Sequence, residues 1–558
     1  MAHRHRLRFI PLLLVGFMFF WVSPPLLAKE TLPRVPKWHR LELTLKSSVA
    51  YTNPLQQAEM RVLFISPLGE TNRVYGFWDG GKEWKIRFKP GFPGRWRYYT
   101  MCSDTANPGL HAKTGEFLCT APEGGSRFQQ HGPVQVARGQ QHLEHADRTP
   151  FFWLGDAAWL AAMKATAADW QEYTKTRAEQ KFNAVQWQLA AATPDGKTTF
   201  FTGSDCIAVN PVAFRQLDAK IIAANQAGLL NAIAPLWEIG AATGLPEDQA
   251  VRLLRYAVAR WGAEDVAWII AFECDSTGEQ ARRWQNIGRA VFNLVNHAPV
   301  VLLPGESFWV CDAFRREKWV DVLGVQTATV RDDNMVPWLL SGPMAQERHK
   351  EPARPLVVIA PPEEGKIFGL DGAIDGDFAR QQLWWNALLN TPAGVSYAAK
   401  DVSDWSVHAF KRELPDPWRE ALTLPGATAI AVLADHFATT EFWKLQPVAR
   451  APSGKREAAG QPQRLVIATT EAQDLTVVYQ PEPQAVSWIA GTPRARQQVI
   501  WLNPRTGERH PVAPAVASAS GSFSPPGPGD WVLMLQRRPE TLPPVKAKKP
   551  DEKIDKRR

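Results

Sequence analysis

The sequence predicts an α/β TIM barrel, (β/α)8, flanked by two all-β sandwich domains. Eight short apolar runs alternate with helix-period segments between residues 127 and 435. Short strands with period-two alternation fill residues 37–121 before this region and residues 436–540 after it. A chain of 558 residues is long enough for about three domains.

Residues 1–28 are predicted to be a signal peptide. Three arginines precede an apolar stretch from Phe9 to Leu27, and the small residue Ala28 follows. Leu26 stands where a small residue is preferred, so an uncleaved anchor is the alternative. We therefore expect an exported protein, periplasmic or extracellular, with no membrane span beyond this segment.

The net charge of +8 resides mainly at the two ends of the chain. The three arginines near the start contribute +3, and residues 546–558 contribute +4 from seven bases and three acids, which leaves about +1. The body is therefore near neutral, and we expect no nucleic-acid partner. Residues 541–558 are predicted to be a basic, disordered tail.

The five cysteines form no Cys/His pattern with metal-ligand spacing, so no metal or other cofactor is predicted. In an oxidising compartment, Cys102 and Cys119 are candidates for a disulfide across neighbouring strands. The odd number leaves at least one free thiol.

The first predicted sandwich contains "LELTL", "MRVLFISP", "EWKIRFKP" and an aromatic strand after a Gly/Pro turn, and "APEGGS" follows as a linker. The eight predicted barrel strands are "PFFWLGD", "FNAVQWQL", "LLNAIAPLW", "VAWIIAF", "PVVLLP", "VDVLGVQT", "RPLVVIA" and "GVSYAA". Pro246 and Glu247 mark the start of one intervening helix. The second predicted sandwich contains "RLVIATT", "LTVVYQ", "QQVIWLNP" and "DWVLMLQ".

Carboxylates, amides and tryptophans follow most of the predicted barrel strands, at the end where TIM barrels carry their active sites. These candidate site residues are Asp156, Trp159, Gln186, Gln188, Trp237, Glu238, Glu273, Asp275, Glu306, Gln326, Glu363, Glu364 and Trp405. Glycoside cleavage needs two carboxyl groups across one bond. Any single acid here is equally well explained as a helix cap, but caps explain poorly why so many strand ends share the pattern.

The middle domain contains the stretches "FFWLGDAAW", "KFNAVQWQL", "VAWIIAFECD" and "WWNALLNTPAGVSYA". In these stretches it resembles glycoside hydrolases with an apiosidase-like barrel, a domain also described as collagenase-like. The flanking regions are similar to the N-terminal β-sandwich and the collagen-binding C-terminal domain that accompany such barrels. The resemblance covers about residues 37–540, and the order of the motifs is its most specific feature.

The resemblance implies an acid/base at the end of the fourth strand, and this role falls on Glu273, with Asp275 as the alternative. Cys274 between them is interpreted as a packed thiol, since no histidine adjoins it. At strand seven the chain departs from the family, because Ala360 stands where the family has its nucleophilic Glu. The nucleophile is therefore assigned to Glu363 or Glu364.

Glu306 and Glu238 are weaker candidates for the nucleophile. The remaining rim residues are assigned to substrate binding. The leading hypothesis is an exported glycoside hydrolase that cleaves a glycosidic bond in a polysaccharide. The alternative is a degenerate barrel that binds carbohydrate or matrix without catalysis. A collagen-directed protease is disfavoured, because no protease signature occurs. The sugar and the oligomeric state stay open.

Overall fold

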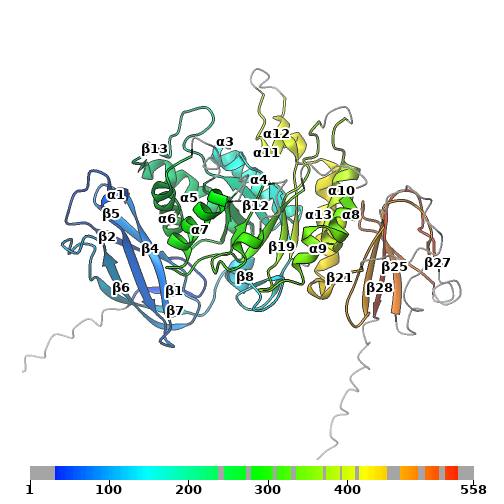
Figure 1. Ribbon diagram of the computed structural model, residues 1–558, viewed down its shortest axis with the longest axis horizontal. Helices are drawn as coiled ribbons and strands as arrows, with labels where there is room; N and C mark the ends of the chain where they lie inside the picture. The colour runs from blue at the N-terminus through cyan, green and yellow to red at the C-terminus, as the bar shows by residue number, and fades with distance from the viewer. Residues whose placement is uncertain are drawn as a thin grey trace, which may run out of the picture.

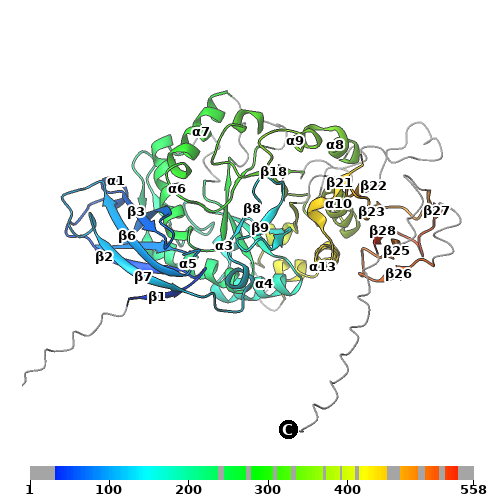
Figure 2. The ribbon, with the colours of Figure 1, turned by 90° about the horizontal axis from the view of Figure 1, so that it is seen from below.

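The computed structural model describes residues 32–236, 244–271, 278–305, 311–327, 335–367, 372–389, 393–408, 414–448, 465–487, 497–513 and 522–537. Three bodies lie in a row along its longest axis, an N-terminal sheet, a central barrel and a C-terminal pair of sheets (Figures 1 and 2). The predicted signal peptide and basic tail lie outside the described residues. Within the described ranges, no helix is long and apolar enough to cross a membrane.

The N-terminal body is one seven-stranded sheet in the order β1-β7-β6-β3-β4-β5-β2. Its strands are β1 (Arg34–Pro36), β2 (Leu41–Lys46), β3 (Met60–Ile65), β4 (Thr71–Gly80), β5 (Glu83–Phe88), β6 (Gly94–Cys102) and β7 (Thr114–Thr120), with helix α1 (Pro54–Gln57) between β2 and β3. Strands two apart in a flat sheet are about 10 Å apart, yet the rings of Phe64 on β3 and Phe88 on β5 stack at 4.0 Å. The sheet therefore curls over its own core and forms a sandwich-like body.

The disulfide suggested for Cys102 and Cys119 is wrong. Cys119 is in register with Gly94 at the start of β6, whereas Cys102 ends that strand. Both thiols are free and buried, and burial raises the pKa of Cys119 to about 11. Two cysteines at opposite ends of a strand pair cannot approach to disulfide distance.

The central body is a closed barrel of eight parallel strands, which confirms the predicted fold class. Each predicted apolar run supplies one strand. The strands are β11 (Trp153–Ala157), β12 (Ala184–Gln188), β15 (Leu230–Ala234), β16 (Val266–Ile270), β17 (Val300–Leu302), β18 (Val322–Gln326), β19 (Leu356–Ala360) and β20 (Gly394–Tyr397). Side chains alternate between the barrel interior, as Ile269 does, and the helix layer, as Trp268 and Ile270 do.

Helices cover the outside of the barrel (Figure 1). They are α3 (Ala161–Lys164), α4 (Ala167–Glu179), α5 (Pro211–Gln226), α6 (Glu247–Trp261), α7 (Gly278–Phe292), α8 (Met335–Ser341), α9 (Pro343–Glu347), α10 (Gly376–Leu389), α11 (Lys400–Ser403), α12 (Pro417–Ala421) and α13 (Pro425–Phe437), with 3-10 turns η2 (Cys311–Phe314) and η3 (Phe442–Lys444). Helix α6 begins at Glu247 after Pro246, as predicted. The Asn210 side chain caps α5 by accepting the backbone N–H of Val212.

A glycine permits close packing at the centre of the barrel. A Cβ at Gly155 would lie 2.5 Å from Gln186 Nε2 and 2.5 Å from Ser396 Oγ. These two atoms hydrogen-bond to each other across the interior. Any side chain at position 155 would therefore break the layer that joins strands β12 and β20.

The amino-terminal end of the barrel is closed by α2 (Arg127–His131) and a small sheet of β8 (Val134–Val136), β9 (Leu143–His145) and β10 (Pro150–Phe151) (Figures 1 and 2). A capping box between Ser126 and Gln129 starts α2. A cavity of about 770 Å³ lies beside this plug, lined among others by His131, Lys181 and Trp443. It is at the end opposite to the one where barrel enzymes carry their chemistry.

The C-terminal body contains two sheets that share an apolar core. The larger sheet comprises β21 (Gln446–Pro447), β22 (Val466–Thr469), β23 (Leu475–Gln480), β28 (Trp531–Arg537), β25 (Gln497–Leu502) and β26 (Arg509–Pro511), and the smaller comprises β24 (Val486–Ser487) and β27 (Ser522–Phe523). Arg380 on α10 joins this body to the barrel through an ion pair of 2.8 Å with buried Asp530. Tyr479 donates to the same carboxylate and stacks on Trp384.

A buried ion network joins the N-terminal sheet to the barrel. Arg260 on α6 is fully buried and pairs at 2.8 Å with both Asp79 of β4 and Asp218 of α5. Arg87 of β5 also pairs with Asp218, at 2.9 Å. Burial alone would raise the pKa of Asp218, but the two guanidinium groups hold it below its usual range.

Candidate functional site

Eight of the predicted site residues lie in the described part of the chain: Asp156, Trp159, Gln186, Gln188, Gln326, Glu363, Glu364 and Trp405. Five lie outside it: Trp237, Glu238, Glu273, Asp275 and Glu306. The predicted acid/base, Glu273, and its alternative, Asp275, are among these five. The assignments to all five residues stay predictions.

Glu363 lies at the carboxyl-terminal rim of the barrel, three residues after the end of β19. Its carboxylate accepts a hydrogen bond of 2.8 Å from Ser403 Oγ, and its other oxygen is 3.1 Å from Lys366 Nζ. The side chain is 16% exposed. The hydroxyl of Ser403 and the ammonium of Lys366 hold this carboxylate in place, and it remains partly open to solvent.

A chain of hydrogen bonds continues from Ser403 around the rim. The carbonyl of Ser403 accepts from the backbone N–H of Leu160, and the carbonyl of Trp159 accepts from the N–H of Gln188. These contacts bring the rim segments of strands β20, β11 and β12 together. Three predicted residues, Trp159, Gln188 and Glu363, therefore belong to one connected arc.

Gln326 and Ala360 pair in register at the ends of β18 and β19. The amide of Gln326 donates to the carbonyl of Pro304 at 2.8 Å. Ala360 packs in the interior cluster of the barrel. Residues Trp159, Gln188, Gln326 and Ala360 are 9%, 7%, 8% and 7% exposed, whereas the interior residues below them are closed to solvent. These four residues form the floor of the site at the rim.

Glu364 has a different environment from its neighbour. One carboxylate oxygen accepts from Tyr397 Oη at 2.6 Å and from the backbone N–H of Gly426 at 3.0 Å. A Cβ at Gly376, the first residue of α10, would lie 2.8 Å from the other oxygen. Glu364 is 3% exposed, and burial raises its pKa. The side chain lies in the helix layer, where it accepts from the start of α13 beside the start of α10.

Asp156 is fully buried behind the first strand. Gly155 faces the interior, so the next side chain points outward, where Asp156 accepts at 2.7 Å from both Tyr173 Oη and Arg177 Nε on α4. The guanidinium of Arg177 lies over the rings of Phe182 and Tyr397. This ion pair anchors α4 to the barrel, and in this position Asp156 presents no surface to a sugar.

Gln186 and Trp405 are also enclosed. Gln186 lies one interior layer below Gln188 and has no exposed surface. Trp405 is 2% exposed and stacks on Trp418 at 4.2 Å. In this structure both side chains support the rim from beneath or behind.

The strand that leads to Glu273 ends in an unusual backbone conformation. Ala271 has φ = 62°, in the left-handed region that disfavours residues with a Cβ. Such strain concentrates at functional sites. It lies two residues before the predicted acid/base.

Sequence reasoning missed several residues that hold this site together. They are Tyr173, Arg177, Lys366, Tyr397 and Ser403. The signal for Arg177 was available, because it falls four residues after Tyr173 on one helix face. Among the described residues, no group of three or more His, Cys, Asp or Glu side chains gathers as a metal site would require. The described contacts give the rim a partly exposed carboxylate, that of Glu363, held by one hydroxyl and one ammonium group.

Three family matches cover most of the chain. "Apiosidase-like, catalytic domain" matches residues 137–444, and a domain of unknown function, DUF5060, matches residues 34–103. "Putative collagen-binding domain of a collagenase" matches residues 456–536. The matches follow the same order as the three bodies of the structure, and they confirm the resemblance drawn from the sequence motifs. Among curated proteins, no significant match is found.

Solved structures of similar fold include two from Bacteroides vulgatus ATCC 8482. One, described as a "putative glycoside hydrolase", is 17% identical and has a TM-score of 0.65, with 90% of this chain and all (100%) of that chain covered. The other, a glycoside hydrolase family 5 structure, is 16% identical and has a TM-score of 0.62, with 74% and 94% covered. At these identities the likeness concerns the fold. The apiosidase-like match spans residues 137–444, more than half of the chain, and so the chain belongs to this family of carbohydrate-active enzymes.

Proposed function

We propose that this protein is an exported glycoside hydrolase that cleaves an O-glycosidic bond in a polysaccharide. The observation that carries the proposal is the rim arc. The half-buried carboxylate of Glu363 accepts from Ser403, the Ser403 carbonyl accepts from the backbone N–H of Leu160, and the carbonyl of the adjacent Trp159 accepts from the backbone N–H of Gln188. Carboxylates perform the reaction, amides hold hydroxyl groups, and an indole accommodates the apolar face of a sugar.

Glu273 is assigned as the general acid that protonates the leaving oxygen, with Asp275 as the alternative. Glu363 is assigned as the nucleophile or the base, because Lys366 and Ser403 hold its carboxylate in place and it is partly exposed at the rim. A separation of about 5–5.5 Å between the two carboxyl groups would give retention, and about 6.5–9.5 Å would give inversion. Glu364 is assigned to positioning, because it is buried among helix termini beside Glu363.

The experiment is hydrolysis of a panel of aryl glycosides and plant and microbial polysaccharides by the purified chain. On any substrate that is cleaved, Glu273→Gln and Glu363→Gln should each reduce kcat by about 10²–10⁴-fold. Glu179→Gln, an exposed carboxylate of α4, is the matched control and should leave kcat unchanged. Wild-type rates in Glu363→Gln would remove Glu363 from the mechanism.

A second function, binding without catalysis, is favoured by one observation. Ala360 places a methyl group in the barrel interior where the family has its nucleophilic carboxylate. Native gel electrophoresis with and without polysaccharide in the gel tests this alternative. If polysaccharide slows the migration of the wild-type protein but no substrate is hydrolysed, the barrel is a binding scaffold. Ala360→Glu separates the cases further, since hydrolysis gained by this variant alone would identify position 360 as the lost catalytic position.

Export is proposed from the character of residues 1–28. Expression of the full chain and of a chain without these residues, followed by fractionation, tests it. The full chain should appear outside the cytoplasm and the shortened one inside. Equal cytoplasmic retention of both would contradict export.

A further inference from the structure

The cavity beside the plug at the amino-terminal end of the barrel, the plug cavity, has a volume of about 770 Å³. Its lining comes from α2, the segment of β9 and β10, and the ends of α4, α5 and α13. Small-molecule sites are typically clefts of about 300–1,000 Å³ with a mainly apolar lining and a few polar groups. The plug cavity fits that description, because apolar residues make up more than half of its lining.

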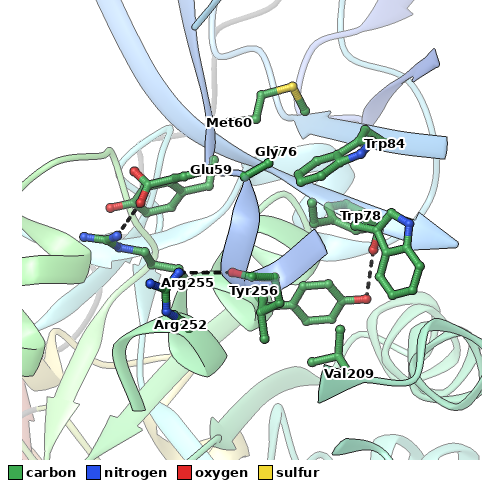
Figure 3. Close-up of a pocket in the computed structure, with 13 residues that line it drawn as sticks. Glu59, Met60, Gly76, Trp78, Trp84, Val209, Arg252, Arg255 and Tyr256 are labelled. Atoms are coloured by element: carbon green, nitrogen blue, oxygen red, sulfur yellow. Dashed lines mark hydrogen bonds and ion pairs between the residues drawn. The ribbon is translucent and has the colours of Figure 1, made fainter. Parts of the chain in front are cut away.

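A smaller cavity, of about 50 Å³, lies where the N-terminal sheet meets α6. Figure 3 shows Glu59 beside Arg255 and Trp78 beside Tyr256 in this region, and each pair is joined by a contact within the protein. A benzene-sized ligand needs about 150 Å³. We therefore interpret the smaller cavity as a packing gap at the joint between two bodies.

Four aromatic rings form a continuous wall of the plug cavity. The ring centroid of Phe152 is 4.4 Å from that of Phe437 and 5.0 Å from that of Phe442. The ring of Phe442 is in turn 5.2 Å from that of Trp443. The three phenylalanines are buried, whereas Trp443 is half-buried. Such a wall favours a ligand with a planar ring, which can pack against it in an offset or edge-to-face arrangement.

One positive charge in the lining of the plug cavity is not balanced. The other charged lining residues form ion pairs, Lys181 with Asp435 at 2.5 Å, Glu441 with Lys444 at 2.7 Å and His131 with Asp147 at 2.8 Å. The side chain of Arg127 has no partner in the part of the chain that the structure describes. It extends from α2 toward the end of α5, where its Nε lies 4.0 Å from the position of a Cβ on Gly228. A free guanidinium favours a carboxylate or a similar anion.

His145 contributes a free acceptor to the same lining. It is 3% exposed, and its Nδ1 lies 2.8 Å from the carbonyl oxygen of Gly132. A carbonyl only accepts, so Nδ1 carries the hydrogen and Nε2 of the neutral ring is an acceptor. Nε2 has no partner among the described residues. Burial, and to a smaller extent the nearby charges of Arg127 and His131, lower the pKa of His145 and keep the ring neutral. The group that this nitrogen lacks is therefore a hydroxyl donor.

The other polar side chains of the lining already have partners within the protein. Asn183 donates to the carbonyl of Phe152 at 2.7 Å. The hydroxyls of Thr439 and Thr440 both donate to the carbonyl of His436. A sugar, with a hydroxyl on most of its carbons, would find few free partners here. An aromatic ring needs only the wall, so the lining favours an aromatic acid over a sugar acid.

We propose that the plug cavity binds a hydroxylated aromatic carboxylate of the hydroxycinnamate type. Arg127 binds the carboxylate, the aromatic wall packs against the ring, and the ring hydroxyl donates to His145. The site lies at the end of the barrel opposite the rim, so the ligand would not occupy the place of the hydrolase substrate. The proposal does not depend on the proposed hydrolase activity, because binding is measured without turnover.

The test is calorimetric titration of the full chain with 4-hydroxycinnamate and three comparison compounds. The uncharged amide of the same acid should bind about tenfold more weakly, because it lacks the carboxylate. Cinnamate, which lacks the hydroxyl, should bind about threefold more weakly or less. Glucuronate has a carboxylate but no aromatic ring, and it should bind about tenfold more weakly. Equal affinity for any of these three compounds, or no saturable binding of 4-hydroxycinnamate, would overturn the proposal.

Two variants locate the site. Arg127→Gln removes the free charge from an exposed side chain and should weaken 4-hydroxycinnamate about tenfold. Trp443→Leu shortens the aromatic wall and should weaken it about three- to tenfold. The matched controls are Arg95→Gln, also exposed, and Trp338→Leu, also half-buried, and neither residue lines the plug cavity.

Both controls should bind as the wild-type chain does, and unfolding curves of all four variants verify that they fold. If Arg127→Gln folds and binds as tightly as Arg95→Gln, the ligand is bound elsewhere and the proposal fails. Equal binding by Trp443→Leu and Trp338→Leu would overturn it in the same way.

Discussion

At the residue scale, the buried pair of Asp156 and Arg177 is the strongest constraint behind the first barrel strand. Both side chains are fully buried, and the aromatic rings around them exclude water. Burial alone would lower the pKa of Arg177, but Asp156 and the nearby tyrosines raise it. A charge held in this way is stable only while its partner remains.

Removing one partner of the Asp156–Arg177 pair should therefore strongly reduce the free energy of unfolding. Asp156→Ala should reduce the free energy of unfolding by about 3–5 kcal/mol, because Arg177 is left buried and uncompensated. Denaturant titration followed by circular dichroism measures it. Glu179→Ala, which breaks the exposed pair with Lys175 on the same helix, is the control and should change little. Equal effects would show that Asp156 is not held as described.

His436 predicts a particular dependence on pH. Burial in α13, with a smaller effect of Arg509, lowers its pKa to about 3 from the ordinary 6.5. Below about pH 6.5 the unfolded chain binds this proton while the folded chain does not, so the unfolding free energy falls as pH decreases. The loss attributable to His436 should approach about 4–5 kcal/mol near pH 3.

The comparison of wild type with His436→Leu isolates this contribution, since other groups titrate in both proteins. The variant should lose less stability than wild type between pH 7 and pH 4 in denaturant titrations. Exposed His349→Leu is the control and should follow wild type. Parallel curves for His436→Leu and wild type would refute the prediction.

At the element scale, the strands could be predicted because they are buried on both faces and appear as continuous apolar runs. The start of helix α6 at Glu247 could also be predicted, because Pro246 precedes it. Alternation also predicts the face of a strand residue, as for Gln186 and Gln188. Alternation does not predict how far along the barrel axis a residue lies. Of these two glutamines, only Gln188 reaches the layer that contacts solvent.

The environment of a residue beyond the end of a strand is harder still to predict from the sequence. Pro361 and Pro362 turn the chain after β19, and the next two glutamates then take opposite environments. No periodicity governs that turn, so the sequence left Glu363 and Glu364 as equal candidates. Their roles depend on contacts with Ser403 and Tyr397, which lie about 40 and 33 residues further along the chain.

Glu364 connects three elements, the loop after β19 and the starts of α10 and α13. Glu364→Ala should destabilise the chain by about 2–3 kcal/mol, because the hydroxyl of Tyr397 and the N–H of Gly426 lose their acceptor inside the protein. Glu364→Gln, which retains an acceptor oxygen, should lose clearly less. Thermal unfolding of both variants distinguishes this anchoring role from a purely catalytic one, for which neither change would lower stability.

At the scale of the whole molecule, the flanking bodies are fixed to the barrel through buried charges. Arg260 contacts a carboxylate of the N-terminal sheet and one of the barrel. Arg380 does the equivalent at the C-terminal body. Interfaces of this kind favour one arrangement of the three bodies, since a shift would leave charges buried and unpaired.

Arg260→Met tests this coupling. It leaves Asp79 and Asp218 with fewer partners and should cost about 3–5 kcal/mol at the interface. We expect the N-terminal sheet to separate earlier, seen as faster cleavage at Glu123, in the linker, by a glutamate-specific protease and as an added unfolding transition. Arg95→Met, on the exposed side of β6, is the control. A single unchanged transition in Arg260→Met would contradict the coupling.

The left-handed backbone of Ala271 sets a trade-off between durability and reactivity. Holding a residue with a Cβ in this conformation costs roughly 1–2 kcal/mol. Glycine would relieve that strain, so Ala271→Gly should make the chain harder to unfold by about 1 kcal/mol. The same change would loosen the backbone two residues ahead of Glu273. If Glu273 is the acid, this single substitution would therefore raise the free energy of unfolding and lower kcat.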